Sequence, residues 1–436
     1  MNKGNSMNLF RETDITLARR SVVKRRDFIR AAGAGAATAG VASWTDVLKA
    51  NAPELRKRGK ACILLWMQGG PSHFETFSPK PGHENGGETK AIKTSVSGVH
   101  YSENLPHVAK VADELAVVRS MTGREGNHQR ATFLMHTGYQ PSAVTKYPTL
   151  GSMVAHEIGD AKNQLPAFVK IGGRRVAVGG GFLGREFDPL VLRTASQPPE
   201  NTVPRTDTER FRRRLNLLGK LDEAAADSAT KSKVAEHRKL YGRASRMILS
   251  PEMQAFDLDK EPSEVRESYG EGNFAAGCLM ARRLVEAGVT FVEVEMNGWD
   301  THQDNFNRSR SLCEQIDQPF AQLVRDLKQR GLLDSTLIVW MGEFGRTPKI
   351  NPRTGRDHYP KAFNAALAGC GIQGGQVVGK TDAGGAEVTD RPVEAADLFR
   401  SIYYALGIDS DKENMSAIGR PVPIVEDGAR VKELFG

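Results

Sequence analysis

Short runs of apolar residues recur along the chain and are typical of strands that are buried on both faces of a parallel sheet. The runs that predict strands are Ala61–Met67, Leu115–Arg119, Leu165–Ile171, Val289–Met296, Thr336–Met341 and Ala365–Gly371. Helical apolar periodicity at Phe274–Ala287 and Val393–Leu406 alternates with these strands. Because strand and helix patterns alternate, we expect an α/β fold with a mostly parallel central sheet.

The segment from about 205 to 270 has a different character, because it is charged and poor in residues that favour strands. Phe211, Leu215, Leu218 and Leu221 recur in it at helical spacing. We therefore predict a helical insertion over the α/β core. A packing or assembly element is the preferred interpretation of this insertion.

Polar residues gather where three of the predicted strands end. The clusters are Gln68–Glu75, Asp300–His302 and Glu343–His358. In a parallel sheet the carboxyl ends of the strands lie along one edge, which is where open α/β sheets carry their sites. The alternative interpretation is a set of surface loops whose acids and histidines pair with arginines.

The residue types in these clusters suit a divalent metal ion. The candidate ligands are Asp300, His302, Glu343, Asp357 and His358. Mixed imidazole and carboxylate ligands suit Zn²⁺, Mn²⁺ or iron, whereas carboxylates alone suit Ca²⁺ or Mg²⁺. Such an ion would polarise an ester oxygen and lower the pKa of a bound water. Arg346 could clamp an anionic group such as phosphate or sulfate.

Two histidines, His128 and His136, lie eight residues apart on a predicted helix. That spacing puts their imidazoles on one face about 12 Å apart, which is too far for one metal ion. His128 follows a glycine-rich turn and could lie at a helix N-terminus, where backbone N–H groups favour anions. An ordinary surface or packing role is the alternative for each histidine.

The net charge of +8 is concentrated near the N-terminus, where the first thirty residues hold eight basic and three acidic side chains. The sequence from Lys24 to Arg30, KRRDFIR, resembles a twin-arginine export signal, and the weakly apolar segment 31–42 after it is typical of a signal core. We expect residues 1–52 to be a signal region that engages the twin-arginine export machinery. The site domain is then 53–436, in the periplasm or at the cell surface of a bacterium.

Without that segment the chain is only mildly basic, so we expect no nucleic-acid partner. No run of the sequence reaches the roughly 18 apolar residues that span a bilayer, so we expect no stable membrane span. The four cysteines form no CxxC pair. Buried thiols are the preferred interpretation, and zinc held by cysteine is not expected.

Four motifs resemble those of the DUF1501 family of bacterial exported proteins, and its planctomycete branch most of all. They are GGPSHFETF (69–77), GWDTHQDNF (298–306), GEFGRTPKIN (342–351) and GRDHYP (355–360), followed by GCGIQGGQVVG. The resemblance covers roughly Cys62–Gly407. The family is grouped with the alkaline phosphatase/sulfatase superfamily, which implies a three-layer α/β/α sandwich with a metal-dependent hydrolase site at the strand ends.

Residue by residue, the resemblance implies that Asp300, His302 and His358 match superfamily ligands. Glu343 stands where the superfamily usually has Asp, and Phe344 replaces the histidine that often follows. The chain departs from the superfamily at the end of its first strand, where Gln68-Gly69 replaces an Asp ligand. A Cys-x-Pro-x-Arg motif is absent from the sequence, which excludes a formylglycine nucleophile.

Two candidate functions follow. The first is an exported metal-dependent hydrolase of phosphate or sulfate esters, whose substrate is an anionic small molecule or a glycan ester. Ser72 is then the candidate nucleophile, and His128 is its candidate neighbour. The second is a non-catalytic protein of the same fold that binds anionic glycans or a cell surface, because the first-strand Asp and the usual nucleophile are missing.

Overall fold

The computed structural model of the chain describes residues 15–16, 22–23, 59–173, 179–200, 202, 206–225 and 231–436. The chain divides into two units, Met1–Ala52 and Pro53–Gly436. In the first unit, strand β1 (Ile15–Thr16) pairs antiparallel with β2 (Val22–Val23). The predicted twin-arginine motif and signal core at 24–42 lie outside the described residues, so the export signal stays a prediction.

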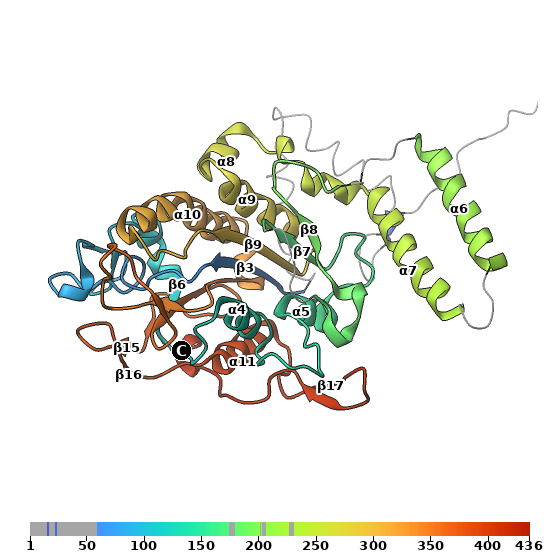
Figure 1. Cartoon of the computed structure of the whole chain (residues 1–436). Helices are drawn as coiled ribbons and strands as arrows, with labels where there is room; N and C mark the ends of the chain where they lie inside the picture. The colour runs from blue at the N-terminus through green and yellow to red at the C-terminus, as the bar shows by residue number, and fades with distance from the viewer. Residues whose placement is uncertain are drawn as a thin grey trace, which may run out of the picture. The chain divides into compact units, whose positions relative to one another are not determined.

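The second unit is built around an eight-stranded sheet whose order is β14-β6-β13-β10-β3-β9-β7-β8 (Figure 1). Its strands are, in that order, Val377–Val378, Leu115–Met121, Phe363–Ala368, Thr336–Met341, Ala61–Gln68, Phe291–Asn297, Phe168–Ile171 and Leu190–Leu192. Neighbouring strands are parallel except that β13 runs antiparallel to both β10 and β6. The prediction of a mostly parallel central sheet is confirmed.

The six predicted strands all occur in this sheet. Thr336–Met341 has the predicted bounds, and the other five have shifted ends. Strand β13 begins two residues before the predicted range and ends at Ala368, because Gly369 and Cys370 take left-handed conformations with φ of +77° and +53°. A 3₁₀ segment, Val108–Glu114, comes directly before β6.

Helices cover both faces of the sheet, which confirms the three-layer α/β/α architecture. Helices α9 (Asn273–Glu286) and α10 (Asn305–Gln329) lie on one face. Helices α4 (His128–Thr137), α5 (Leu150–Ile158) and α11 (Ala395–Leu406) lie on the other (Figure 1).

The strand at the centre of the sheet shows why an apolar run without alternation forms here. Residues Ala61 to Met67 of β3 are all buried. Cys62, Leu64 and Trp66 belong to the core cluster that also contains residues of α5 and α11. The residues between them point to the opposite face of the sheet, because strand side chains alternate. A strand covered on both faces therefore needs apolar residues at every position.

The charged segment at 205–270 contains helices α6 (Thr208–Ala225), α7 (Lys231–Ile248) and α8 (Ser263–Ser268), together with short 3₁₀ turns. Its assignment as an insertion stays a prediction. The four cysteines are buried and free, as the sequence indicates. Within the described residues, none of the helices is both long and apolar enough to cross a membrane.

A buried ion network joins this helical segment to the layer formed by α9 and α10. The Arg282 side chain is fully buried and pairs with Glu261 and Glu286 at 2.8 Å each. Its Nε also lies 3.0 Å from Asp326 Oδ2 of α10. Tyr269 donates to the same Asp326 oxygen at 3.0 Å. Since Glu261 and Tyr269 belong to the 205–270 segment, the network fixes the end of that segment on α9 and α10.

A second buried cluster lies between β7 and β9. Lys170 forms ion pairs with Glu293 and, at 2.6 Å, with Glu295. His136 Nε2 lies 3.4 Å from Glu293 Oε1, while Thr132 O accepts a hydrogen bond from His136 Nδ1. Burial opposes ionisation of Glu293, but Lys170 and His136 outweigh it and lower the pKa of this carboxyl to about 2.

Glu293 should therefore stabilise the fold in a pH-dependent way. A carboxylate whose pKa is depressed by folding stabilises above its unfolded pKa of about 4.5, and this stability is lost as the pH falls toward 2. We expect Glu293→Gln to lower the free energy of unfolding at pH 7 by about 2–3 kcal/mol. Urea denaturation at several pH values measures this, and the difference from the wild type should shrink below pH ~4.5. A difference that is the same at pH 3 and pH 7 would contradict the assignment.

Candidate metal centre

Three strand ends meet at one edge of the sheet. Gln68, the last residue of β3, pairs with Asn297, the last residue of β9. On the other side of β3, Trp66 pairs with Met341 at the end of β10. The segments that follow β9 and β10 therefore leave the sheet beside the end of β3. This juxtaposition is the one that the sequence predicts.

Gly69 brings the three segments into direct contact. Its φ is +118°, and a Cβ there would lie 2.5 Å from the backbone nitrogen of Asp300. Its N–H donates to Glu343 Oε1 at 2.9 Å, and its carbonyl oxygen accepts a hydrogen bond from Arg346 Nη2. Only glycine permits both the backbone conformation and the close approach.

The Asp300 carboxylate is the centre of a cluster of three histidines. Its Oδ1 lies 3.0 Å from His302 Nε2 and 3.2 Å from His358 Nε2. Its Oδ2 lies 3.4 Å from His128 Nε2. Ligand atoms of His128, Asp300 and His358 all lie within 4.8 Å of one another, as in a metal site. We call Asp300, His128, His302 and His358 the histidine cluster.

Each histidine of the cluster is anchored through its other ring nitrogen. His128 Nδ1 lies 2.7 Å from Glu343 Oε1, and His302 Nδ1 lies 2.7 Å from Asp357 Oδ1. His358 Nδ1 lies 2.8 Å from the carbonyl oxygen of Gly126. A carbonyl or an ionised carboxylate only accepts hydrogen bonds, so each Nδ1 carries the proton and donates it. Each neutral imidazole then presents an unprotonated Nε2 toward Asp300.

This arrangement fits a cation. His302 Nε2 and His358 Nε2 lie only 2.9 Å apart, so their two lone pairs would repel each other unless a proton or a cation lies between them. His128 Nε2 is buried and has no hydrogen-bond partner among the described residues. Metal-ligating histidines typically donate the other ring N–H to a carboxylate or a backbone carbonyl, as all three do here. Three imidazoles and one carboxylate suit Zn²⁺ or Mn²⁺ better than Ca²⁺ or Mg²⁺.

The electrostatics of the cluster keep Asp300 ionised. Partial burial opposes this, but the hydrogen bond from the Arg346 guanidinium and its positive charge hold the pKa of Asp300 at about 2. The hydrogen bond to Glu343 raises the pKa of His128, whereas burial lowers the pKa of His358. The hydrogen bond from His302 lowers the pKa of Asp357. Asp300 is therefore ionised at neutral pH and is paired with the Arg346 cation.

Glu343 and Asp357 lie behind the histidines rather than among the groups that converge on Asp300. Glu343 is buried, and its Oε1 accepts hydrogen bonds from Gln68 Nε2 (3.0 Å), from the Gly69 N–H and from His128. Oε1 is thus occupied by three donors, whereas among the described residues Oε2 accepts only the Gly69 N–H, at 3.1 Å. Asp357 contacts the cluster through His302 Nδ1. In this geometry the two acids contact histidines of the cluster, and their expected role as metal ligands stays a prediction.

The contacts of Arg346 differ from those expected of an anion clamp. Its side chain is fully buried, and it donates to Gly70 O at 2.9 Å, to Arg356 O at 3.2 Å, to Gly69 O and to Asp300 Oδ1 at 2.6 Å. It lies on β11 (Gly345–Arg346), which pairs with β12 (His358–Tyr359), so Arg346 and His358 are directly opposite each other. Arg346 therefore positions Asp300, since four oxygens already occupy four of its five N–H donors.

Among the described residues, no interaction joins Ser72 to the histidine cluster. It is buried, with 1% of its surface exposed, and its Oγ accepts a hydrogen bond from the Phe74 N–H at 3.3 Å. The structure therefore gives no geometric support to Ser72 as the nucleophile. His128, predicted as its neighbour, is instead a member of the histidine cluster at the first turn of α4.

Two hydrogen bonds of the site were not predicted from the sequence. Gln68 Nε2 donates to Glu343, and the Gly126 carbonyl fixes the His358 ring. The sequence showed that Gln68 departs from the superfamily pattern, but it did not show that Gln68 contacts Glu343. A backbone carbonyl leaves no signal in the side-chain sequence, so Gly126 could not be found.

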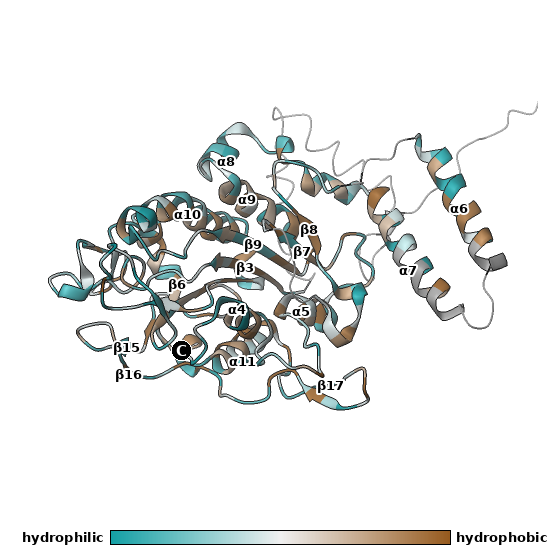
Figure 2. Cartoon of the chain, in the orientation of Figure 1, coloured by the Kyte–Doolittle hydropathy of each residue, from teal (hydrophilic) through white to brown (hydrophobic). Residues whose placement is uncertain are grey.

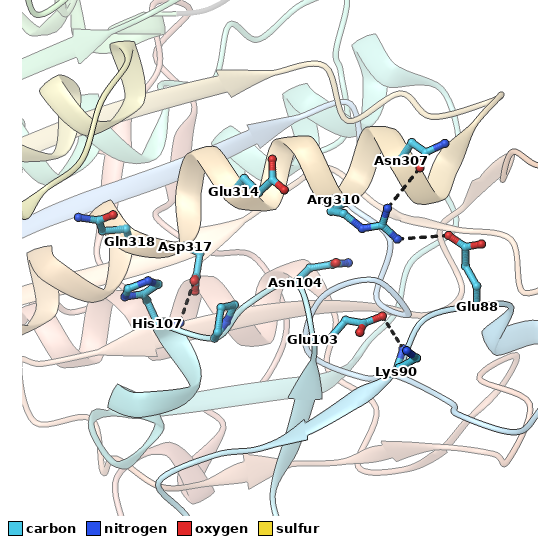
Figure 3. Close-up of a pocket in the computed structure, with 11 residues that line it drawn as sticks. Glu88, Lys90, Glu103, Asn104, His107, Asn307, Arg310, Glu314, Asp317 and Gln318 are labelled. Atoms are coloured by element: carbon cyan, nitrogen blue, oxygen red, sulfur yellow. Dashed lines mark hydrogen bonds and ion pairs between the residues drawn. The ribbon is translucent and has the colours of Figure 1, made fainter.

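A groove of about 900 Å³ runs along α10, apart from the histidine cluster (Figure 3). Arg310 of α10 pairs with Glu88 across it at 3.3 Å, and Asp317 accepts the backbone N–H groups of His107 and Val108 at 2.7 Å each. Four carboxylates and only two permanent cations line the groove. It therefore does not suit an anionic glycan.

Comparison with solved structures finds distant similarity to ester hydrolases. A sulfatase from a Pseudoalteromonas species is 13% identical, with a TM-score of 0.42, covering 90% of this chain and 76% of that one. A phosphonate monoester hydrolase from Silicibacter pomeroyi is 12% identical, with a TM-score of 0.34, covering 86% and 76%. An alkaline phosphatase superfamily protein from Vibrio parahaemolyticus is 13% identical, with a TM-score of 0.38, covering 84% and 75%.

No curated protein matches the chain by sequence. The profile of the family described as "Protein of unknown function (DUF1501)" matches residues 59–435. That match includes all four members of the histidine cluster and the residues that anchor them. The chain therefore belongs to the DUF1501 family.

Proposed function

We propose that the protein is a metal-dependent hydrolase of sulfate or phosphate esters that is exported by the twin-arginine route. The observation that carries the proposal is the histidine cluster, in which three anchored imidazoles present Nε2 to one ionised carboxylate. The ester class follows from the motifs shared with the alkaline phosphatase/sulfatase superfamily. The export route rests on the N-terminal motif alone.

His128, His302, His358 and Asp300 would hold the ion, and Zn²⁺ or Mn²⁺ suits this donor set. A divalent ion there supplies a Lewis acid for an anionic ester and lowers the pKa of a bound water. The chain's own contribution is orientation. Glu343, Asp357 and the Gly126 carbonyl fix the three rings, and Arg346 keeps Asp300 charged and in place.

The second candidate, a non-catalytic binding protein on the same fold, is favoured by one specific observation. Ser72 is buried and accepts a hydrogen bond within its own loop, so the candidate nucleophile is not seen to contact the histidine cluster among the described residues. Either candidate predicts a bound metal ion. Only the first predicts turnover of an aryl sulfate or aryl phosphate ester that is lost when the cluster is altered.

Metal content tests the histidine cluster directly. We expect the full chain to bind about one equivalent of Zn²⁺ or Mn²⁺, and His358→Ala to weaken that binding by more than about 100-fold, since even outer partners of metal ligands contribute 10–100-fold. Equilibrium dialysis followed by mass spectrometry of the metal measures both.

His136→Gln is the matched control, because His136 lies on the same helix as His128 but faces Glu293. It should retain the metal. If wild type and His358→Ala bind the same amount of metal, or neither binds any, the proposed centre is wrong.

A further inference from the structure

The helices α6 and α7 carry most of the positive charge of the domain. Residues 208–225 and 231–248, which we call the basic hairpin, contain eleven basic and four acidic side chains, a net charge of +7. The rest of residues 53–436 has a net charge of −4. The positive charge of the domain is therefore local, and the proposed hydrolase site does not account for it.

The two helices are tied to each other and to the core by a few polar contacts. Arg238 of α7 donates to the carbonyl oxygen of Gly219 in α6 at 2.9 Å. Arg243 of α7 donates to Glu186 O at 3.3 Å. Figure 2 shows α6 and α7 side by side, with apolar and polar positions interleaved along α6. Arg238 thus joins α7 to α6, and Arg243 joins α7 to the rest of the domain.

Helix α6 has two apolar faces, and only one of them is partly covered. Phe211, Leu215 and Leu218 are half-buried. Leu217 and Leu221, one helical turn apart, are each 57% exposed. A soluble helix normally turns a single apolar stripe inward, so the exposed pair calls for an explanation.

Arginines share the exposed face with the two leucines. Arg210 and Arg214 precede Leu217 and Leu221 at spacings of 7, so the four residues follow one face of α6. Both arginines are exposed, and neither side chain forms an ion pair with any residue that the structure describes. Their charges are available to a partner.

We propose that this face of the basic hairpin docks the protein on an anionic lipid surface. Exposed leucines flanked by arginines are the composition of helices that lie in a membrane interface, where leucine enters the acyl boundary and arginine contacts the lipid phosphates. Each basic residue near an anionic leaflet contributes about 1 kcal/mol. A nucleic acid or an acidic polysaccharide would match the charge but would leave the leucines exposed to water.

Docking through the basic hairpin would hold the hydrolase site near a surface without a membrane span. This role is independent of the proposed catalysis, because the hairpin contains none of the histidine cluster. A result that contradicts membrane docking would therefore not contradict the proposed hydrolase activity, and the reverse also holds.

Vesicle sedimentation of the full chain tests the docking surface. We expect binding to vesicles of phosphatidylglycerol and phosphatidylcholine to exceed binding to phosphatidylcholine alone by at least about tenfold, and to fall as salt rises. Leu217→Ser/Leu221→Ser and Arg210→Gln/Arg214→Gln should each reduce the binding by about tenfold or more.

Ile418→Ser is the matched control, because Ile418 is 66% exposed and lies outside the hairpin. It should bind vesicles like the wild type. Circular dichroism should show unchanged helix content in all variants, and ester hydrolysis should be unchanged in the Leu217/Leu221 variant.

Three results would overturn the proposal. One is equal sedimentation with both kinds of vesicle. Another is a dimer in sedimentation equilibrium that the Leu217/Leu221 variant dissociates, which assigns the face to a second copy of the chain. The third is retention of a single-stranded oligonucleotide that the Arg210/Arg214 variant abolishes while vesicle binding is absent.

Discussion

Asp300→Asn is expected to lower the hydrolysis of an aryl sulfate or aryl phosphate ester by at least about 10³-fold. Metal-assisted charge stabilisation contributes several kcal/mol to such reactions, and 10³-fold corresponds to about 4 kcal/mol. The substitution keeps the shape of the side chain but removes the carboxylate charge that faces all three Nε2 atoms. Steady-state rates with saturating Zn²⁺ or Mn²⁺ measure the loss.

The loss of activity in Glu343→Gln should be compared with the loss in Asp300→Asn. Glu343 orients His128 from behind, and outer partners of this kind typically affect metal affinity or activity by 10–100-fold. We therefore expect a smaller loss than for Asp300→Asn. If Glu343→Gln abolished activity while Asp300→Asn retained it, Glu343 would be the ligand and our ordering of the site would be reversed. If the wild type binds metal but turns over neither ester, the binding-protein alternative is preferred.

Arg282→Met is expected to lower the free energy of unfolding by about 3–5 kcal/mol, the usual cost of removing one partner of a buried ion network. Arg282 is fully buried and faces three carboxylates, Glu261, Glu286 and Asp326. Methionine fills much of the space but leaves those acids with fewer cations. Urea denaturation at neutral pH measures the difference.

A surface pair provides the control for this measurement. Arg266 pairs with Asp259 at 2.8 Å, but 43% and 89% of the two side chains are exposed. Exposed pairs contribute about 0–1 kcal/mol, so Arg266→Met should change stability by no more than that. Equal effects of the two substitutions would show that burial does not determine the strength of the Arg282 network.

The sheet could be predicted from the sequence because its signal is local. An apolar run such as Ala61–Met67 must be covered on both faces, and the glycines that follow it indicate a turn of the chain. The direction of β13 could not be predicted, because a buried strand has the same pattern whether it runs parallel or antiparallel. Its length was misjudged at Gly369, where only the backbone conformation shows that the strand has ended.

The members of the site could be predicted better than their roles. Asp300, His302 and His358 follow from strand-end position and motif resemblance, and the structure brings them together. Residue type does not reveal which imidazole nitrogen faces inward. Residue type also did not show that one oxygen of Glu343, Oε1, accepts donors from three other positions.

Buried arginines were the hardest residues to interpret. Arg346 looked like an anion clamp because a guanidinium suits phosphate and sulfate. Its donors instead hold backbone oxygens and Asp300. Arg282 carried no signal at all, since its carboxylate partners lie on segments up to 44 residues away. Long-range ion networks are invisible to local periodicity.

The close approach at Gly69 has a consequence for how the protein matures. Backbone atoms of the β3 and β9 ends, together with the Glu343 carboxylate, are held together there by packing and hydrogen bonds that need no ion. Zinc fingers need the free energy of metal binding in order to fold, whereas the residues of this site are brought together by the folding of the sheet. The metal-free chain should therefore be a stable, cooperatively folded protein. Metal loading would then be its final step, one that could occur in whichever compartment supplies the ion.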